Sequence, residues 1–398
     1  MNPQEAPRRM TQPAPYDVHA LRAAEFPHVG PSPYLNAASV GPLPERSRRA
    51  VEAYNGHRSR IHELRDEHFE GVLAACRAAA ARLIGAGDDE IALLPNTSHG
   101  INLAAMTLPV PAGMRMVVSD QEFPANVYPW MARARRDGVT LTRVPADALG
   151  RPDEDRILEE LDRGDVAVFA LSAVQFSTGW HADVPRLGRF CRERGIRFVV
   201  DAIQSLGQIP FDVGEAEVDV LATGGQKWLL SPFATGFTYV RRELHEVLEP
   251  QVAGWTSMQA SADYSDCVDY RWGWVPGARR YEVATPAFQD FPGMTASMEL
   301  LMEVGVDRIR THLAALIDPL AAWLAEHGTT VVSDLRPERR SGIFCFRPRD
   351  LRGAMRALHA AGIVCVPREG AVRISPHLYN THDEMARVIE VLDAAGVA

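Results

Sequence analysis

The sequence predicts an α/β protein, with a mostly parallel seven-stranded sheet covered by helices on both faces and a smaller α+β unit after it. Three observations predict this class. Short apolar runs alternate with amphipathic stretches through the first part of the chain, and a segment rich in aromatic and turn residues then interrupts the alternation. The chain has 398 residues, 46% of them apolar, which is enough for a large core divided between two domains.

The seven apolar runs are short, as strands buried on both faces are. They cover residues 91–94, 116–119, 139–144, 166–172, 197–200, 218–222 and 236–240. Helical periodicity precedes or separates them at residues 44–60, 69–84, 125–136, 153–162 and 184–194. Strands that alternate with helices in this way are typical of a parallel sheet.

The rest of the chain predicts an irregular connection and a second unit. Residues 251–292 contain the aromatic stretch from Tyr264 to Trp274, which favours a larger or apolar substrate nearby. A long helix is expected at 307–327, strands at 329–332, 342–347, 363–366 and 371–375, and helices at 351–361 and 382–394. The expected division is a loose, proline-rich arm (1–33), a large domain (34–290), and a linking helix with a small domain (291–398), against which N-terminal helices can pack.

Composition excludes several functions. The net charge of −9 and the lack of a concentrated basic face argue against a nucleic-acid partner. The chain contains no run of about 18 apolar residues, so the sequence predicts no membrane span. The first residues also lack a secretory pattern, and a cytoplasmic location is therefore expected. The 5 cysteines are widely spaced, which favours buried free thiols over disulfides or a metal site.

One residue type is nearly absent. Among 42 lysines and arginines the chain has a single lysine, Lys227. Arginine supplies positive charge equally well, but only lysine can lose its proton when buried and condense with an aldehyde. The solitary lysine is therefore expected to perform chemistry that arginine cannot, although a leftover surface lysine is the alternative.

The surroundings of Lys227 favour the chemical interpretation. It follows an apolar strand and the pair Gly224-Gly225, where small residues let a flat ring approach the backbone. Asp201 ends another strand, at the sheet edge where α/β proteins bind ligands. Facing a pyridine nitrogen, its carboxylate would keep that nitrogen protonated, and Gln204 lies three residues further on. A helix cap is the alternative role for Asp201.

Two further patterns suit a phosphorylated, planar ligand. Residues 95–100 follow a strand and open a helix, so Thr97, Ser98 and the adjacent His99 lie where free N–H groups bind phosphate. Ordinary helix capping explains the same residues. Phe123 follows the strand ending at Ser119 and offers an aromatic face, although most such phenylalanines are core residues.

Together these motifs resemble the class V aminotransferase superfamily of fold-type-I enzymes that depend on pyridoxal 5'-phosphate (PLP), which includes cysteine desulfurases, kynureninase and isopenicillin N epimerase. The resemblance covers nearly the whole chain. Its motifs are Tyr34–Ser39 with Gly41–Pro44, Asn96–Asn102, Glu122–Asn126, Gln175–Gly179, Asp201–Gln204, Gly224–Leu229, Tyr281–Pro286, Val372–His377 and Tyr379–Thr381.

The resemblance implies a role for each matching residue. Lys227 would form the Schiff base with PLP, Asp201 would face the pyridine nitrogen, and Gln204 would donate to the phenolate oxygen. Thr97, Ser98, His99 and Gln226 would contact the phosphate region and Phe123 would stack on the ring. Thr285 would reach the phosphate of a neighbouring subunit, which implies a homodimer with shared active sites. Arg373 would hold the substrate α-carboxylate, with Asn36 and Gln175 as further substrate or cofactor contacts.

The chain also departs from the desulfurases. The segment Pro367–Gly370 replaces the loop on which they carry a catalytic cysteine, and Cys365 lies in an apolar run typical of a core residue. Phenylalanine, not histidine, occupies the ring-stacking position. These departures argue against a desulfurase that forms a persulfide.

The expected chemistry begins when an amino acid displaces Lys227 and forms an external aldimine. Lys227 then removes the Cα proton to give a carbanion or quinonoid. Loss of a Cβ substituent makes a β-lyase, reprotonation at C4' an aminotransferase, and reprotonation at Cα an epimerase. A C–S β-lyase or an aminotransferase is favoured, with the epimerase as the alternative and the substrate left open. A dicarboxylate-specific aminotransferase needs a second arginine, for which Arg279, Arg280 and Arg368 are candidates.

Two other classes of protein share some of these features. A dinucleotide-dependent oxidoreductase shares the α/β alternation but should show Gly-x-Gly-x-x-Gly after an early strand, and this chain does not. A non-catalytic PLP-binding regulator needs an effector module, and the short arm before Tyr34 cannot hold a DNA-binding domain.

Overall fold

The computed structural model describes residues 16–262, 266, 268 and 270–396. It contains a seven-stranded sheet in the order β1-β7-β6-β5-β4-β2-β3. The strands are β1 (Ile91–Leu93), β2 (Arg115–Ser119), β3 (Leu141–Val144), β4 (Val166–Ser172), β5 (Arg197–Asp201), β6 (Val220–Gly224) and β7 (Gly236–Val240). Only β7 runs against its neighbours, β6 and β1, which confirms the mostly parallel sheet.

Both faces of this sheet are buried because alternate residues of each strand enter different cores. On β4, for example, Phe169 and Leu171 join one core, while Val168 and Ala170 join the other. The first core includes α3 (Glu70–Ile84), α6 (Glu154–Leu161), α7 (Val184–Glu193) and α8 (Phe291–Val304). The second includes α4 (Thr97–Thr107) and α5 (Tyr128–Asp137). The predicted helices on both faces are confirmed.

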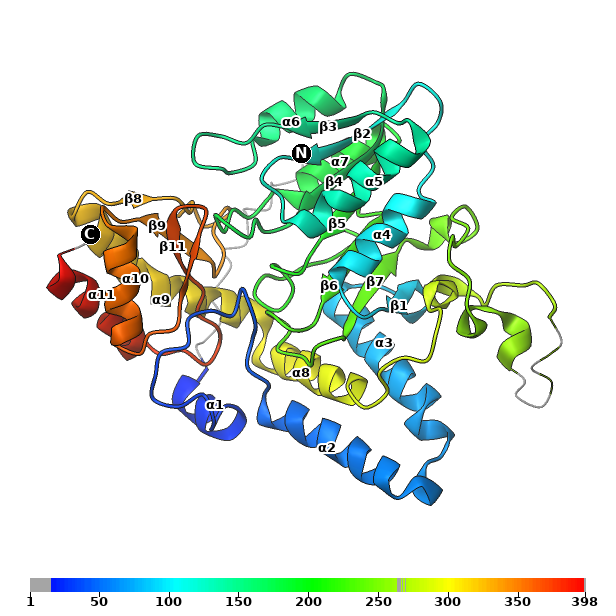
Figure 1. The fold of residues 1–398 in the computed structure, drawn as a ribbon, viewed down its shortest axis with the longest axis horizontal. Coiled ribbons are helices and arrows are strands. Elements are labelled where there is room, and N and C mark those ends of the chain that lie inside the picture. The colour runs from blue at the N-terminus through cyan, green and yellow to red at the C-terminus, as the bar shows by residue number, and fades with distance from the viewer. Residues whose placement is uncertain (1–15, 263–265, 267, 269, 397–398) are drawn as a thin grey trace, which may run out of the picture.

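A smaller antiparallel sheet, ordered β10-β11-β9-β8, forms the second unit (Figure 1). Its strands are β8 (Thr330–Val331), β9 (Phe344–Arg347), β10 (Val366–Arg368) and β11 (Ala371–Ile374). One face packs through Phe344, Phe346, Val372 and Ile374 against α9 (Val306–Glu326), α10 (Leu351–Ala360) and α11 (His382–Ala395). The opposite face is therefore left for other contacts.

The expectation of a loose arm is wrong for residues 16–33. They contain α1 (Val18–Glu25), which Asp17 caps by accepting from the backbone N–H groups of His19 and Ala20. Arg22 forms an ion pair of 2.7 Å with Glu384, and the Tyr16 hydroxyl donates to the carbonyl of Leu378 at 2.7 Å. Contacts far away in the sequence thus hold this segment to the C-terminal unit.

The helix expected at 307–327 is preceded by a second one that the pattern did not predict. Helices α8 and α9 meet at Gly305, whose φ of 92° lies in the region that favours glycine. Pro292 and Gly293, near the start of α8, are typical of a turn, so the sequence did not predict this helix. Helix α8 nevertheless packs on α3 and on α2 (Glu45–Ser59). The limits of the two domains remain a prediction.

Two more segments refine the expectations. The strand expected at 363–366 begins only at Val366, because the backbone of Val364 instead hydrogen-bonds to that of Pro33 and Leu35. Before α8 begins at Phe291, the described part of 251–292 contains short 3₁₀ turns, at Trp255–Ser257, Gln259–Ala262 and Gly277–Tyr281, and an isolated bridge between Met258 and Trp274. Other 3₁₀ turns are Ile61–Glu63, Asp66–His68, Asp88–Glu90, Pro124–Asn126 and Arg242–Leu244. Residues 1–15, Tyr264 and Cys267 lie outside the described residues.

Candidate active site

Lys227 lies three residues beyond the end of β6, on a turn that the N-terminal segment holds in place. The N–H of Gly41 donates to the carbonyl of Gln226 at 2.8 Å. A Cβ at position 41 would lie 2.3 Å from the carbonyl oxygen of Lys227, so only glycine allows this approach. Leu230, three residues after the lysine, has a φ of 53°, a strained value for a bulky residue.

Trp228 anchors the other side of the same turn. Its indole Nε1 donates to Gln204 Oε1 at 2.7 Å, and its carbonyl accepts from His377 Nε2 at 2.9 Å. Gln204 Nε2 in turn donates to the carbonyl of Ala38 at 3.1 Å. Gln204 therefore ties the lysine turn to the N-terminal segment, and its proposed contact with the phenolate oxygen stays a prediction.

The environment of Lys227 favours its neutral amine. Burial, opposed by the negative charge of Asp201 and reinforced by the positive charges of Arg373 and Arg368, lowers the pKa of Lys227 to about 8. Roughly a tenth of the amine is consequently unprotonated at pH 7, far more than for an ordinary lysine, and condensation with an aldehyde requires this neutral form.

Asp201 ends β5 at the same edge of the sheet, paired in register with Ser172 and Ala222. The side chain is buried, and its Oδ1 accepts from the backbone N–H of Ile203 at 3.0 Å. Burial raises the pKa of Asp201 to about 6. Such a carboxyl gains stabilisation from a cationic partner, which a protonated pyridine nitrogen would supply.

A second buried carboxyl, which the sequence reasoning did not single out, lies next to Asp201. Glu122 Oε1 accepts from the backbone N–H of Ser172 at 3.0 Å, and Oε2 accepts from the Ser172 hydroxyl and from Asn126 Nδ2. Burial and the negative charge of Asp201 raise the pKa of Glu122 to about 7. The sequence signal was its place in the motif Glu122–Asn126, directly before the aromatic residue.

Phe123 faces the lysine. The Lys227 Nζ lies 5.4 Å from the centre of the Phe123 ring, which packs edge-on against Phe176 at 5.3 Å between ring centres. Phe123 is 44% exposed, so its ring is no core residue. Its position allows it to stack on a planar group bonded to Lys227.

The start of α4 has the features of a phosphate site. Asn96 caps the helix by accepting from His99 N at 3.0 Å, and the buried hydroxyl of Thr97 has no hydrogen-bond partner among the described residues. Ser98 and His99 are exposed beside it. A Cβ at Gly100 would lie 2.2 Å from the Thr238 hydroxyl, so glycine lets the helix approach β7 closely. Thr285 is exposed on a separate segment, and its role stays a prediction.

Arg373 is a buried cation whose hydrogen-bond partners, among the residues the structure describes, are all neutral. Its Nη1 donates to the carbonyl of Phe176 at 3.0 Å, and its Nη2 to Ser39 Oγ at 2.7 Å and to Asn36 Oδ1 at 3.5 Å. The Arg373 Nε and the nearby Gln175 Nε2 have no partner among the described residues. Burial lowers the pKa of Arg373 to about 10. A buried guanidinium of this kind is suited to an anionic substrate group.

These residues fit PLP: a neutral lysine amine under an aromatic face, a buried carboxyl, and a helix N-terminus with an unpartnered hydroxyl. The fold and the site define a fold-type-I PLP enzyme. The sequence profile of the class V aminotransferases matches residues 34–388, and the chain belongs to this PLP-dependent enzyme family.

Curated relatives extend over most of the chain. An uncharacterized aminotransferase, YcbU of Bacillus subtilis, is 29% identical over 93% of this chain and 96% of its own length. An isopenicillin N epimerase of Streptomyces clavuligerus is 28% identical over 90% of this chain and 94% of its own length.

Solved structures share the fold. A cysteine desulfurase of Thermococcus onnurineus has a TM-score of 0.83 at 22% identity, covering 94% of this chain and 97% of its own. The cystine C–S lyase C-DES has a TM-score of 0.84 at 22% identity, covering 94% of this chain and all (100%) of its own. No helix within the described ranges has the length and apolar character needed to cross a membrane.

Proposed function

We propose that the chain is a C–S lyase, which removes a sulfur substituent from Cβ of an L-cysteine conjugate by β-elimination, with amino transfer as the alternative. The observation that carries this proposal is the Lys227 amine, with a pKa of about 8, beneath Phe123 and electrostatically coupled to Asp201. PLP, when bound, supplies the electron sink that stabilises negative charge at the substrate Cα.

The residues of the chain divide the remaining tasks. Lys227 takes the Cα proton onto Nζ, Asp201 keeps a proton on the ring nitrogen, and Arg373 orients the α-carboxylate. The C–S electron pair leaves with sulfur, which takes up a proton as the free thiol. One water completes the balance: conjugate plus water gives thiol, pyruvate and ammonia.

The four cysteines that the structure describes support release of the thiol rather than its capture on the enzyme. Cys76, Cys191, Cys345 and Cys365 are free and buried. Burial raises the pKa of Cys345, which pairs in register with Arg373, to about 12, so this thiol is a poor nucleophile. The turn at Pro367–Gly370 carries no sulfur.

A panel of L-cysteine conjugates and other L-amino acids tests the function of the purified holoenzyme. Mass spectrometry should show pyruvate and thiol in equal amounts with at least one conjugate. A keto acid that retains the substrate side chain would establish amino transfer instead, and a racemised substrate would establish epimerisation. A chain that retains PLP yet converts no amino acid would favour the regulator.

We also propose a homodimer, in which Thr285 approaches the phosphate of the partner subunit. Thr285 is exposed in the isolated chain, and in the preceding segment Tyr270 and Trp272 are 88% and 73% exposed, which is unusual for large apolar side chains outside an interface. Light scattering should give twice the chain mass, and Thr285→Ala should weaken retention of PLP. A monomer with full PLP occupancy would contradict this assembly. Cytoplasmic location stays a prediction, consistent with the free thiols.

A further inference from the structure

The hairpin of β10 and β11 directs two arginines to the same side. Arg373 pairs in register with Val366, and Arg368 pairs with Ala371. Paired residues of antiparallel strands lie on the same face of the sheet, so Arg368 and Ala371 share a face. Residues two apart on one strand also share a face, so Ala371 and Arg373 do as well. Arg368 and Arg373 therefore project from one face of the hairpin. The opposite face carries Val372 and Ile374 into the core of the small unit.

Arg368 has no acidic partner within the described part of the chain. Its guanidinium contacts only the carbonyl of Pro367, at 2.9 Å. The two other candidates for a second substrate-binding arginine are occupied, since Arg279 pairs with Glu70 at 3.1 Å and Arg280 with Glu246 at 3.0 Å. Arg368 is therefore the candidate that remains available to an anionic ligand.

The charge of Arg368 acts inside the active site. The pKa values of Lys227 and Arg373 are lowered first by burial and then also by the positive charge of Arg368. Among the described residues, Arg373 hydrogen-bonds only to neutral groups and Arg368 only to the carbonyl of Pro367. One α-carboxylate would pair with one of these two permanent cations, which leaves the other without an acid.

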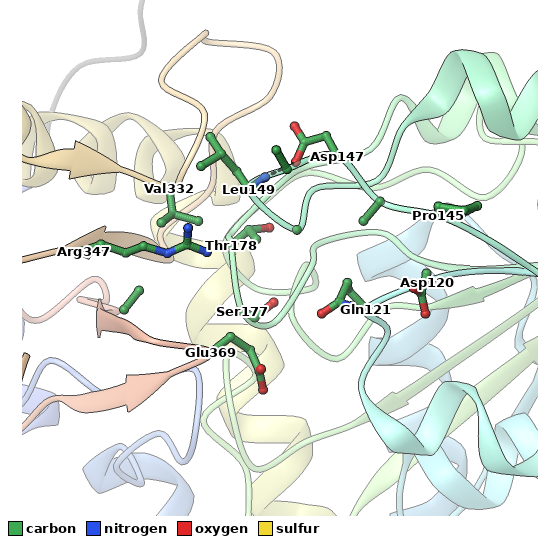
Figure 2. Close-up of a pocket in the computed structure, with 14 residues that line it drawn as sticks. Asp120, Gln121, Pro145, Asp147, Leu149, Ser177, Thr178, Val332, Arg347 and Glu369 are labelled. Carbon is green, nitrogen blue, oxygen red and sulfur yellow. Dashed lines mark hydrogen bonds between the residues drawn. The ribbon is translucent and has the colours of Figure 1, made fainter.

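A cavity of about 320 Å³ borders the turn of this hairpin, where Glu369 and Ala371 line it (Figure 2). Its lining also includes Asp120, Asp147 and Arg347, but neither Arg368 nor Lys227. Figure 2 shows Arg347 extending from β9 toward Thr178, while the Glu369 carboxylate points away from that guanidinium. Ala371, the register partner of Arg368, connects the cavity with the arginine face of the hairpin.

We propose that Arg368 binds a second anionic group of the substrate, while Arg373 holds its α-carboxylate. The substrate class is then an L-amino acid whose side chain ends in a carboxylate, either an acidic amino acid or a cysteine conjugate with a terminal carboxylate. This inference rests on the proposed PLP chemistry and adds the specificity of the same site.

Matched ligand pairs test the inference on the holoenzyme. S-carboxymethyl-L-cysteine is compared with S-carbamoylmethyl-L-cysteine, and L-aspartate and L-glutamate with their amides, by titrating the visible absorption of bound PLP. The wild type should bind at least one carboxylate about tenfold or more tightly than its amide, as a charge-assisted hydrogen bond provides. The pair that shows the preference separates conjugates from acidic amino acids.

Variants assign the preference to a residue. Arg368→Gln should reduce the ratio of carboxylate affinity to amide affinity to near one, while the affinity for the amides stays within about twofold of the wild type. Arg368→Lys should retain part of the carboxylate preference because the charge remains without the planar fork. Arg349 is an exposed arginine in the loop after β9, and Arg349→Gln should change neither the carboxylate preference nor the affinity for the amides.

The outcomes keep the two proposals apart. If no amino acid alters the spectrum, the PLP function itself fails. If neutral amino acids bind and the carboxylates bind no more tightly than their amides, the PLP function stands and only the role of Arg368 is refuted. If Arg347→Gln cancels the preference and Arg368→Gln retains it, the second anion belongs to Arg347 and the assignment is overturned.

Discussion

The Lys227 amine lies 5.4 Å from the centre of the Phe123 ring, and no other lysine occurs in the chain. Covalent attachment of PLP therefore has one possible side chain. Borohydride reduction followed by peptide mapping should place the modification on Lys227 alone. Lys227→Arg keeps the charge but cannot condense with an aldehyde, and activity should fall by roughly a thousandfold. Detection of a reduced adduct in that variant would contradict the assignment.

The pKa of Lys227 can be measured without ambiguity because its signal is unique. In protein freed of PLP, the amine should titrate near pH 8 in an NMR experiment, below its ordinary value of 10.5. Asp201→Asn removes the negative charge that raises this pKa, so the amine should titrate still lower. Titration of the wild-type amine above pH 10 would show that the side chain is solvated.

Replacement of Phe123 tests stacking on the cofactor. Because the ring is 44% exposed, Phe123→Ala should leave the unfolding midpoint nearly unchanged. Loss of an aromatic contact worth about 1 kcal/mol should weaken retention of PLP several-fold. Phe123→Tyr keeps the ring and should bind PLP as the wild type does, and equal retention by the alanine variant would remove Phe123 from the cofactor site.

Much of this architecture could be predicted from the sequence. The strands at 166–172 and 236–240 coincide with β4 and β7, because apolar runs bounded by turn residues report burial on both faces. The positions of Lys227 and Asp201 could be predicted for the same reason, since one follows such a run and the other ends one, so both lie at the same edge of the sheet.

Other features depend on contacts that no local pattern contains. Helix α1 is held by Leu378 and Glu384, more than 350 positions away, so residues 16–33 looked like a loose arm. The hydrogen bond between Ser172 and Glu122 is likewise a tertiary contact. The ion pairs that occupy Arg279 and Arg280, and so distinguish them from Arg368, are tertiary contacts too. The composition shows many arginines, but it does not show that Arg368 and Arg373 have no acidic partner among the described residues.

Glu122 should make the stability of the protein without PLP depend on pH. Burial raises its pKa from 4.5 to about 7, so the folded chain binds this proton more tightly than the unfolded chain. The resulting stabilisation is complete below pH 4.5 and is lost as the pH rises to about 7, on the order of 3 kcal/mol. Glu122→Gln should lose correspondingly less stability over this range in denaturant titrations. Parallel curves for both proteins would show that Glu122 is ionised at a normal pH.

The buried ion pair of Arg77 and Glu282 holds the segment from Glu282 to Thr285 against α3. Glu282 accepts from Arg77 Nη2 at 2.6 Å and from the backbone N–H of Leu93 at 2.8 Å. Arg77→Ala should destabilise the protein by about 3–5 kcal/mol because it leaves a buried carboxylate unpaired. Arg82→Ala on the same helix breaks an exposed contact of 3.7 Å with Glu299 and should cost less than about 1 kcal/mol. Equal unfolding midpoints for the two variants would refute this difference.

Gly41 is expected to control the position of the lysine turn. A methyl group there overlaps the Lys227 carbonyl, so Gly41→Ala should displace the turn and reduce PLP occupancy more than stability. Gly56→Ala, within α2 and with no atom nearer than 3.9 Å, should raise stability by up to about 1 kcal/mol and leave occupancy intact. Full occupancy in Gly41→Ala would show that the turn adapts.

The strand-like segment at residues 34–41 hydrogen-bonds to Val364 and Ser375 on one side and to Gln226 on the other. During synthesis, its partners at 364–375 leave the ribosome well after β7 completes the large sheet at Val240. A nascent chain that has not yet reached residue 375 therefore lacks these contacts beside the lysine turn, so vitamin B6 aldehyde meets the complete pocket only once they have formed.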